Sequence, residues 1–382
     1  MCKTSEDTQL RVPSPMQYPD YRVSADATPR ELRRMAMKAM EDMLSIQWTA
    51  SHYLAHKRRN PKIDVTFEYH PGQLFAGTPY CNAGMPFVAW FEYYNTQTGV
   101  LEYPGDGEAM NMALSSTCAR SVINAWYTVV NSINDPGSSY YMNPYYNYIP
   151  VGGYRIDPTI QDLREYQSDR IIADNGHDVM LGCLSQVQMA DTLVTNPEQH
   201  VIMAKEDAYT VYRPDGSIDP EESYIIIQDQ RGGKKTGWYE RDYNGIKINA
   251  TGRVHMKYTF AYLLQHSYIP MSCAEFQGTK PYEAPWVTCK ACKDIRSLET
   301  ARLESNYPMP VIKLVAEDER GNRTLLARVL NKAYDRHYDL SGLTSQLTSE
   351  MLAEHEGKLV KLIVTVPNAL RFIPVSFVLG KD

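Results

Sequence analysis

A series of short apolar runs between residues 190 and 230 constrains the fold of this 382-residue chain more than any other feature. The runs are rich in β-branched and aromatic residues, and they occupy residues 190–194, 200–205, 209–212 and 223–230. Turn residues such as Pro214-Asp215-Gly216 separate them, which is typical of neighbouring strands in an antiparallel sheet. The main helical patterns precede this region, so the sequence predicts an α+β fold.

Two prominent helices are predicted ahead of the strands. Thr28-Pro29-Arg30-Glu31 combines a capping threonine, a first-turn proline and a glutamate that closes a capping box. A helix is therefore expected from here to about Trp48. A second apolar helix is expected to begin at Cys118 and to run to about Ile133, where Asn134-Asp135-Pro136-Gly137 would stop it.

The chain is longer than one ordinary hydrophobic core requires, so we expect more than one domain. Residues 1–60 are predicted to form a polar arm and a helix that packs on the core, and residues 61–287 the main domain. In residues 288–382, short apolar runs alternate with turn signals such as Glu319-Arg320-Gly321-Asn322. This pattern predicts a small β-sandwich as an accessory domain.

The composition is that of a soluble globular protein, with 43% apolar residues and a net charge of −6. This mild acidity argues against nucleic-acid binding, which requires clustered basic residues. No apolar run reaches about 18 residues, so no transmembrane segment is expected. Met1-Cys2-Lys3-Thr4-Ser5 lacks the apolar stretch of a signal peptide. The expected location is therefore the cytoplasm, or the cell envelope or exterior if a leader has been removed.

Seven cysteines occur at positions 2, 81, 118, 183, 273, 289 and 292, without the spacing of a disulfide framework. Cys273, Cys289 and Cys292 could supply three zinc ligands, but no histidine follows at the spacing of a zinc finger. We therefore expect no metal and no cofactor. These residues are interpreted as structural thiols or as one local disulfide.

Cys118 is the residue with the clearest chemical potential. A thiol at the start of a helix faces unpaired backbone N–H groups and the positive end of the helix dipole, which favour the thiolate. His200 lies on a predicted strand 82 residues later, and a thiolate with an imidazole forms a nucleophile with its base. His177, in a turn after Asn175-Gly176, is the alternative base.

A third residue is needed to orient the imidazole, and the strand Ser223–Gln230 is its expected source. Gln228 and Gln230 share one face of this strand, and an amide oxygen can accept from an imidazole N–H. We predict Gln230 as the orienting residue, with Gln228 as the alternative. The same alternation directs Asp229 away from His200.

Tyrosine is unusually frequent, with 28 residues against 8 phenylalanines. Many of the tyrosines fall in residues 138–154, a loop long enough to suggest a functional role. Aromatic side chains with a polar tip suit the wall of a binding groove, and we assign Tyr145, Tyr146 and Tyr148 to such a groove. The other interpretation of this segment is surface packing.

The order of these features resembles that of the NlpC-type cysteine peptidases, cell-wall endopeptidases of the papain-like superfamily. In that family a cysteine heads a helix, a His-Val pair lies on the first following sheet strand, and a polar residue lies on the next. Residues 73–80 (Gln-Leu-Phe-Ala-Gly-Thr-Pro-Tyr) resemble the entry ahead of the nucleophile, and residues 190–194 resemble the Gly-Asp-Leu strand. The likeness extends to a divergent gut-bacterial group with a trailing β domain.

The resemblance implies a papain-like core, with N-terminal helices packed on an antiparallel sheet, and hydrolysis of an amide in peptidoglycan stem peptides. Cys118 would attack the carbonyl and His200 would protonate the leaving amine. The Cys118 N–H and Tyr80 would stabilise the oxyanion, with Gly77 near the substrate. The family's Asp-Cys-Ser-Gly stands here as Thr117-Cys118-Ala119-Arg120. This departure keeps open a non-catalytic envelope, glycan or peptide-binding protein, and the shared dyad also allows an acyltransferase.

Overall fold

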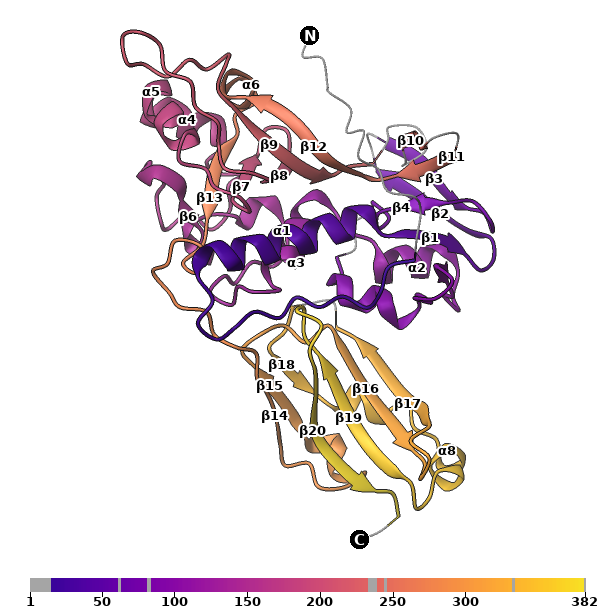
Figure 1. Cartoon of the computed structure of the whole chain (residues 1–382). Coiled ribbons are helices and arrows are strands. Elements are labelled where there is room, and N and C mark those ends of the chain that lie inside the picture. Colours follow the sequence, from indigo (N-terminus) through magenta and orange to yellow (C-terminus); the bar gives the residue numbers. More distant parts are fainter. Residues whose placement is uncertain are drawn as a thin grey trace. The chain divides into compact units, whose positions relative to one another are not determined.

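The computed structural model describes residues 15–60, 63–80, 84–232, 239–243, 246–331 and 334–380 (Figure 1). Helices and several sheets occur together, which confirms the α+β class. The chain divides into two compact units. The first comprises Val23–Gly84 and Tyr93–Tyr282, with the residues before Tyr18, and the second comprises Tyr18–Arg22, Met85–Glu92 and Glu283–Asp382.

This division departs from the predicted domains at the N-terminus and near residue 85. The helix within residues 1–60 is part of the first unit, whereas Met85–Glu92 belongs to the second. The division at Tyr282 lies close to the predicted boundary after residue 287. Among the described residues, no helix has the length and apolar character needed to cross a membrane.

A six-stranded sheet forms the centre of the first unit, in the order β12-β9-β8-β7-β13-β6. Its strands are β6 (Ile149–Pro150), β7 (Thr192–Thr195), β8 (His200–Ala204), β9 (Tyr224–Gln230), β12 (Gly252–Thr259) and β13 (Ile269–Ser272). Every neighbouring pair is antiparallel, in line with the alternating apolar runs. One face carries an apolar cluster that includes Leu193, Ile202 and Ile227.

Six helices accompany this sheet in the described part of the first unit (Figure 1). They are α1 (Pro29–Ser45), α2 (Gly107–Leu114), α3 (Cys118–Trp126), α4 (Ser168–Asn175), α5 (His177–Leu184) and α6 (Phe260–Gln265). Leu184 of α5 and Leu263 of α6 join the apolar cluster on the sheet. Helix α1 begins with the predicted capping box, in which Thr28 and Glu31 bond to each other's backbone N–H.

Smaller sheets complete the first unit. One has the order β10-β11-β4-β1-β5, and a separate hairpin pairs β2 with β3. The strands are β1 (Gln47–Ala50), β2 (Leu54–Asn60), β3 (Ile63–Tyr69), β4 (Phe75–Ala76), β5 (Val100–Leu101), β10 (Tyr239–Tyr243) and β11 (Ile246–Ala250). Short 3-10 turns η2 (Ser139–Tyr141), η3 (Pro144–Tyr146) and η4 (Val151–Gly153) occupy the tyrosine-rich segment.

Helix α3 ends at Trp126, before the predicted end near Ile133. Thr128 N–H bonds to Ala125 O and Val129 N–H to Trp126 O, so the chain tightens into three-residue turns. The Thr128 hydroxyl also donates to Ala125 O at 2.7 Å. A threonine that bonds back to the preceding turn competes with the regular helical ladder, which explains the early end.

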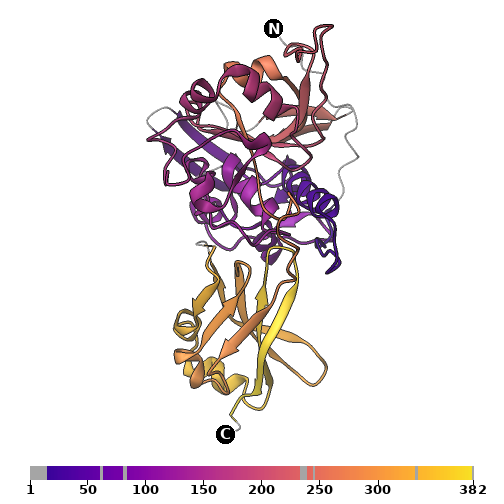
Figure 2. The ribbon, with the colours of Figure 1, turned by 90° about the vertical axis from the view of Figure 1, so that its left-hand side faces the viewer.

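The second unit has two antiparallel sheets, β14-β15-β18 and β17-β16-β19-β20 (Figure 2). The strands are β14 (Val287–Lys290), β15 (Arg302–Ser305), β16 (Val311–Glu317), β17 (Arg323–Leu330), β18 (His337–Asp339), β19 (Leu359–Thr365) and β20 (Arg371–Val378). The turns η1 (Phe87–Glu92) and η5 (Ser297–Thr300) and the helices α7 (Ser341–Thr344) and α8 (Ser349–Glu354) accompany them. Leu303 of one sheet and Leu314 and Leu362 of the other share one apolar core.

Candidate active site

Cys118 is the first residue of α3, and local hydrogen bonding explains why the helix starts there. Thr117 has extended backbone angles, and its hydroxyl accepts the N–H of Arg120 at 3.3 Å. This cap places the thiol in the first helical turn, where the N–H groups have no partner within the helix. The helix dipole adds positive potential at the same point, so the position favours a thiolate.

The Cys118 thiol contacts the side chain of His200 and the backbone at the start of β8. The His200 imidazole and the N–H of Val201 lie close enough to the sulfur to lower the pKa of the thiol. The Gln199 carbonyl oxygen lies 3.9 Å from the sulfur, and the Tyr80 hydroxyl lies 3.8 Å from it. The structure therefore brings together three of the residues that the sequence assigned to the site, Cys118, His200 and Tyr80.

The environment favours a charged form of this pair. Burial raises the pKa of the Cys118 thiol, but its hydrogen bond to His200 and the charge of that residue outweigh burial and lower the pKa. Burial lowers the pKa of His200, but hydrogen bonds to Asp229 and Cys118 outweigh it and raise the pKa to about 9. Both shifts favour the pair in which Cys118 is a thiolate and His200 an imidazolium.

Asp229 is the third member of the cluster. Its carboxylate oxygen Oδ2 lies 2.8 Å from His200 Nε2, which leaves Nδ1 as the ring nitrogen available to the thiol. The Asp229 side chain is fully buried. Burial raises its pKa, but the hydrogen bonds from His200 and Arg253 outweigh burial and hold the pKa well below the usual range. The carboxylate thus orients the imidazole and stabilises its charge.

The assignment of Gln230, or alternatively Gln228, as the orienting residue is wrong. Gln228 donates from Nε2 to Met37 O at 3.3 Å, on α1. The reason is the register between β8 and β9, in which Met203 pairs with Gln228. Because paired residues share a face, Gln228 and Gln230 lie on the Met203 face of the sheet, and Asp229 lies on the face of His200.

Gln230 instead ties together the segments that carry Tyr80 and Cys118. Its Nε2 donates to Thr78 O at 2.7 Å and to Thr78 Oγ1 at 2.9 Å. Its Oε1 accepts from the hydroxyl of Ser121, one turn after Cys118 on α3. One buried amide therefore fixes α3 against the strand segment that leads to Tyr80.

Replacing Gln230 with Leu is expected to lower the free energy of unfolding by about 1–3 kcal/mol, because it leaves buried polar groups without their partner. Urea denaturation of the two proteins at neutral pH measures the difference. Gln228→Leu provides the comparison, since that side chain makes only long contacts, at 3.3 Å to Met37 O and at 3.6 Å to the Met203 sulfur. Equal stability of wild type and Gln230→Leu would contradict the linking role.

Gly77, which the resemblance placed near the substrate, belongs to the backbone framework of the turn ahead of Tyr80. Its N–H donates to Ile46 O at 2.8 Å, and its carbonyl accepts the Trp48 indole N–H at 3.1 Å. Its φ is +80°, and an added Cβ would lie 2.7 Å from Thr251 Oγ1 and 2.9 Å from Leu44 O. Both backbone groups are thus occupied, and only glycine fits this turn ahead of Tyr80.

Tyr148 was assigned to a groove wall, but it is a core residue with 1% exposure. Its ring packs on Trp126 with 5.4 Å between centroids. Trp126 is the last residue of α3, about 12 Å along the helix axis from Cys118. Tyr145 is exposed and contacts Tyr146 with 5.0 Å between centroids, and a groove at these two residues stays a prediction.

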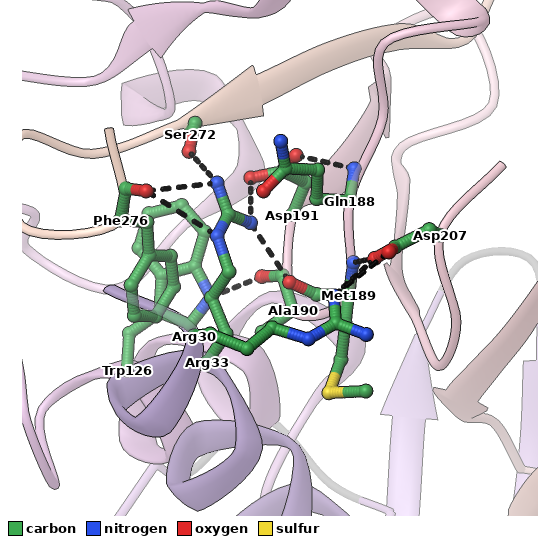
Figure 3. Close-up of polar contacts among 10 residues, drawn as sticks. All are labelled: Arg30, Arg33, Trp126, Gln188, Met189, Ala190, Asp191, Asp207, Ser272 and Phe276. Atoms are coloured by element: carbon green, nitrogen blue, oxygen red, sulfur yellow. Dashed lines mark hydrogen bonds and ion pairs between the residues drawn. The ribbon is translucent and has the colours of Figure 1, made fainter. Parts of the chain in front are cut away.

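A buried ion pair joins helix α1 to the segment before β7 (Figure 3). Arg33 of α1 donates from Nη1 to Asp191 Oδ1 at 2.7 Å and to Met189 O at 2.8 Å, and both charged side chains are 1% exposed. The Arg33 guanidinium also donates to Phe276 O and lies over the Phe276 ring. Asp191, which the resemblance placed on the strand before the histidine, thus has a structural role.

The C-terminal end of helix α3 is bonded to the same segment before β7. The Trp126 indole N–H donates to Ala190 O at 2.8 Å (Figure 3). Asp191 leads directly into β7, which pairs with β8 from Thr195 opposite His200. The segment before β7 therefore holds α1 and α3 in fixed positions relative to the strand that carries the base.

Arg253 is the functional candidate that the sequence did not suggest. It donates from Nε to Asp229 Oδ1 at 2.8 Å and from Nη2 to Asp229 Oδ2 at 2.6 Å. The sequence did contain a sign that Asp229 has such a partner, since a carboxylate within a buried apolar strand requires charged or hydrogen-bonding partners.

His177, the alternative base, lies exposed at the start of α5.

The described residues contain no group of three or more His, Cys, Asp or Glu side chains placed to hold a metal ion. A comparison with protein-family models gave no match, and comparisons with curated proteins and with solved structures gave none either.

Proposed function

We propose that this protein is a cysteine hydrolase that cleaves an amide bond in a peptide through a Cys118 thiolate and an acyl-enzyme. The observation that carries the proposal is the chain of contacts from the Cys118 sulfur through His200 to Asp229. A nucleophile, a base and a carboxylate that orients the base are the parts that acyl transfer requires.

The reaction follows from the charge state of these residues. The Cys118 thiolate attacks the carbonyl carbon, and the oxygen becomes an oxyanion. The Cys118 N–H at the helix start and the Tyr80 hydroxyl are the candidate donors to this oxyanion. His200 gives its Nδ1 proton to the leaving amine as the C–N bond breaks, which leaves a thioester. Neutral His200 then takes a proton from water, whose oxygen attacks the thioester and releases acid and thiolate.

The order of the parts supports a papain-like core as the finer description of this fold. The cysteine heads α3, the histidine opens β8 and the acid lies on the neighbouring strand β9, with α1 and α3 contacting these strands. The resemblance to NlpC-type peptidases supplies the substrate class, an amide in peptidoglycan stem peptides. In this proposal the replacement of the usual Asp and Ser beside Cys118 alters substrate choice and leaves the nucleophile intact.

Cys118 is expected to react with an alkylating probe at neutral pH much faster than the buried Cys183 and Cys273. Burial raises the pKa of Cys183 and Cys273, which keeps them as thiols. His200→Ala should reduce the labelling rate of Cys118 by more than ten-fold because the thiolate loses its partner. Peptide mapping by mass spectrometry after timed labelling measures the rate at each cysteine.

Cys118→Ser serves as the blank, since it removes only this thiol. Equally slow labelling of every cysteine in the wild type would remove the basis for catalysis. Incubation with stem peptides then tests the reaction itself, because a hydrolase yields a free carboxylate and an acyltransferase joins the acyl group to an added amine. Intact stem peptides after long incubation with a fast-labelling protein would reject this substrate class.

A further inference from the structure

Cross-strand pairing places Arg253 directly opposite Asp229. In the ladder between β12 and β9, Gly252 pairs with Gln230 and Arg253 with Asp229. Paired residues share a face of the sheet, so the guanidinium lies beside the carboxylate on the side where His200 projects. Both carboxylate oxygens accept from Arg253, at 2.8 Å and 2.6 Å.

A β-bulge produces this placement. Arg253 pairs with Asp229 and Met256 with Ile227, so β12 has one residue more than β9 between these two pairs. Arg253 and Met256 are three positions apart, and in a regular strand residues with this spacing lie on opposite faces. The bulge brings both onto the face of the apolar cluster, where Met256 packs, and bulges commonly re-aim a side chain beside a functional site.

With Arg253 included, the buried charges of the site balance. In the thiolate–imidazolium form that the proposed function uses, Cys118 and Asp229 carry negative charge, and His200 and Arg253 carry positive charge. We call these four residues the charge network. The Arg253 side chain is 18% exposed and Asp229 is fully buried, so water screens their interaction weakly.

The other titratable groups around the charge network do not disturb this balance. Tyr262 on α6 and Tyr268 before β13 have raised pKa values through burial, that of Tyr262 reaching about 12, and both are neutral in the working range. Further out, Glu198 pairs with His266 at the partly exposed rim, and Arg231 is exposed. Two phenols complete the surroundings: Tyr258, whose hydroxyl accepts from Arg253 Nη2 at 3.0 Å, and Tyr80 beside the thiol.

We propose that Arg253 is a positioning residue that, through Asp229, sets the pH range over which Cys118 is a thiolate. It acts in two ways. The fork of the guanidinium fixes the carboxylate against His200 Nε2, and its charge neutralises that of Asp229. Without Arg253 the charge network would carry a net negative charge in a buried site, and it would bind protons more tightly. This inference rests on the proposed function only for the identity of the nucleophile.

Arg253→Gln keeps a hydrogen-bond donor and removes the charge. The pH at which Cys118 reaches half of its maximal alkylation rate is expected to rise by about one unit, the size expected for one nearby, partly screened charge. Arg253→Lys keeps the charge but not the paired hydrogen bonds of the guanidinium. The pH midpoint of alkylation in this variant should stay within about 0.3 units of wild type, while the maximal alkylation rate falls. Arg30→Met, which breaks an exposed ion pair with Asp207, is the control and should leave the midpoint unchanged.

An unchanged or lowered midpoint in Arg253→Gln, with only lower stability, would overturn the inference. Equal shifts in the Gln and Lys variants would overturn the charge effect. If Arg253→Gln does not fold, the test compares the Asp229→Asn/Arg253→Gln double variant with Asp229→Asn. Removing the positive charge should raise the midpoint in this pair as well, and equal midpoints would overturn the inference. A shifted midpoint in a protein that cleaves no peptide would leave this inference standing and reject the proposed function. A wild-type Cys118 with the midpoint of an ordinary thiol would reject both.

Discussion

Asp229→Asn is expected to reduce the rate of peptide cleavage by roughly a hundred-fold to ten-thousand-fold, because the imidazolium loses the carboxylate that orients and stabilises it. The asparagine has nearly the same shape, so the loss reflects charge more than packing. The substitution also leaves Arg253 without its counter-ion, and a buried guanidinium near His200 disfavours the imidazolium. Steady-state cleavage of a stem peptide, or Cys118 alkylation in its absence, measures the effect.

The pH dependence of this variant should change in a defined direction. Hydrogen bonding to Asp229 and Cys118 raises the pKa of His200 to about 9 against the opposing effect of burial. Without the carboxylate, burial weighs more and the pKa of His200 falls. Peptide cleavage needs protonated His200 as its acid, so the alkaline limit of cleavage moves to lower pH.

Gln230→Leu provides the comparison, since the sequence pattern had assigned the orienting role to Gln230. Its reactivity should fall far less than that of Asp229→Asn, at a temperature where both are folded. A near-normal rate in Asp229→Asn, together with a large loss in Gln230→Leu, would return the orienting role to the glutamine.

Arg33→Met is expected to lower the free energy of unfolding by about 3–5 kcal/mol, because it leaves the Asp191 carboxylate buried without its partner. The guanidinium also donates to Met189 O and Phe276 O, and these carbonyls lose a donor at the same time (Figure 3). Thermal and urea denaturation measure the loss.

The double variant Arg33→Met/Asp191→Leu separates the charge effect from packing. Burial raises the pKa of Asp191 even though the charge of Arg33 lowers it, so the ion pair does not fully offset the cost of desolvation. Removing both charges should therefore recover much of the lost stability. A double variant less stable than Arg33→Met would contradict this account.

The parts of the fold that depend on local chemistry followed from the sequence. The capping box at Thr28 and Glu31 and the start of α3 at Cys118 are set by hydrogen bonds within a few residues. The antiparallel arrangement of β7, β8 and β9 followed from short runs and turn signals. These features placed Cys118 and His200 on the elements that bring them together.

The identity of the acid depended on information that a single strand does not contain. Alternation along β9 separates Asp229 from Gln228 and Gln230, but it does not say which set faces His200. The register with β8 decides this, and a register moved by one residue would exchange the two sets. The bulge in β12 interrupts the alternation of that strand. The face of the sheet on which Arg253 lies could therefore not be predicted from sequence spacing. The tyrosine segment depended on long-range packing in the same way, through the contact of Tyr148 with Trp126.

The balance of charges in the charge network also affects the order in which its residues could be lost during evolution. Any single replacement of a charged member leaves an unmatched charge in a buried place, so a lineage without selection for reactivity is expected to discard the members in pairs of opposite sign. An intermediate with one member missing would carry a cost in folding as well as in rate. In this chain His200 contacts Asp229 and Asp229 contacts Arg253, so neither positive group lacks a negative partner.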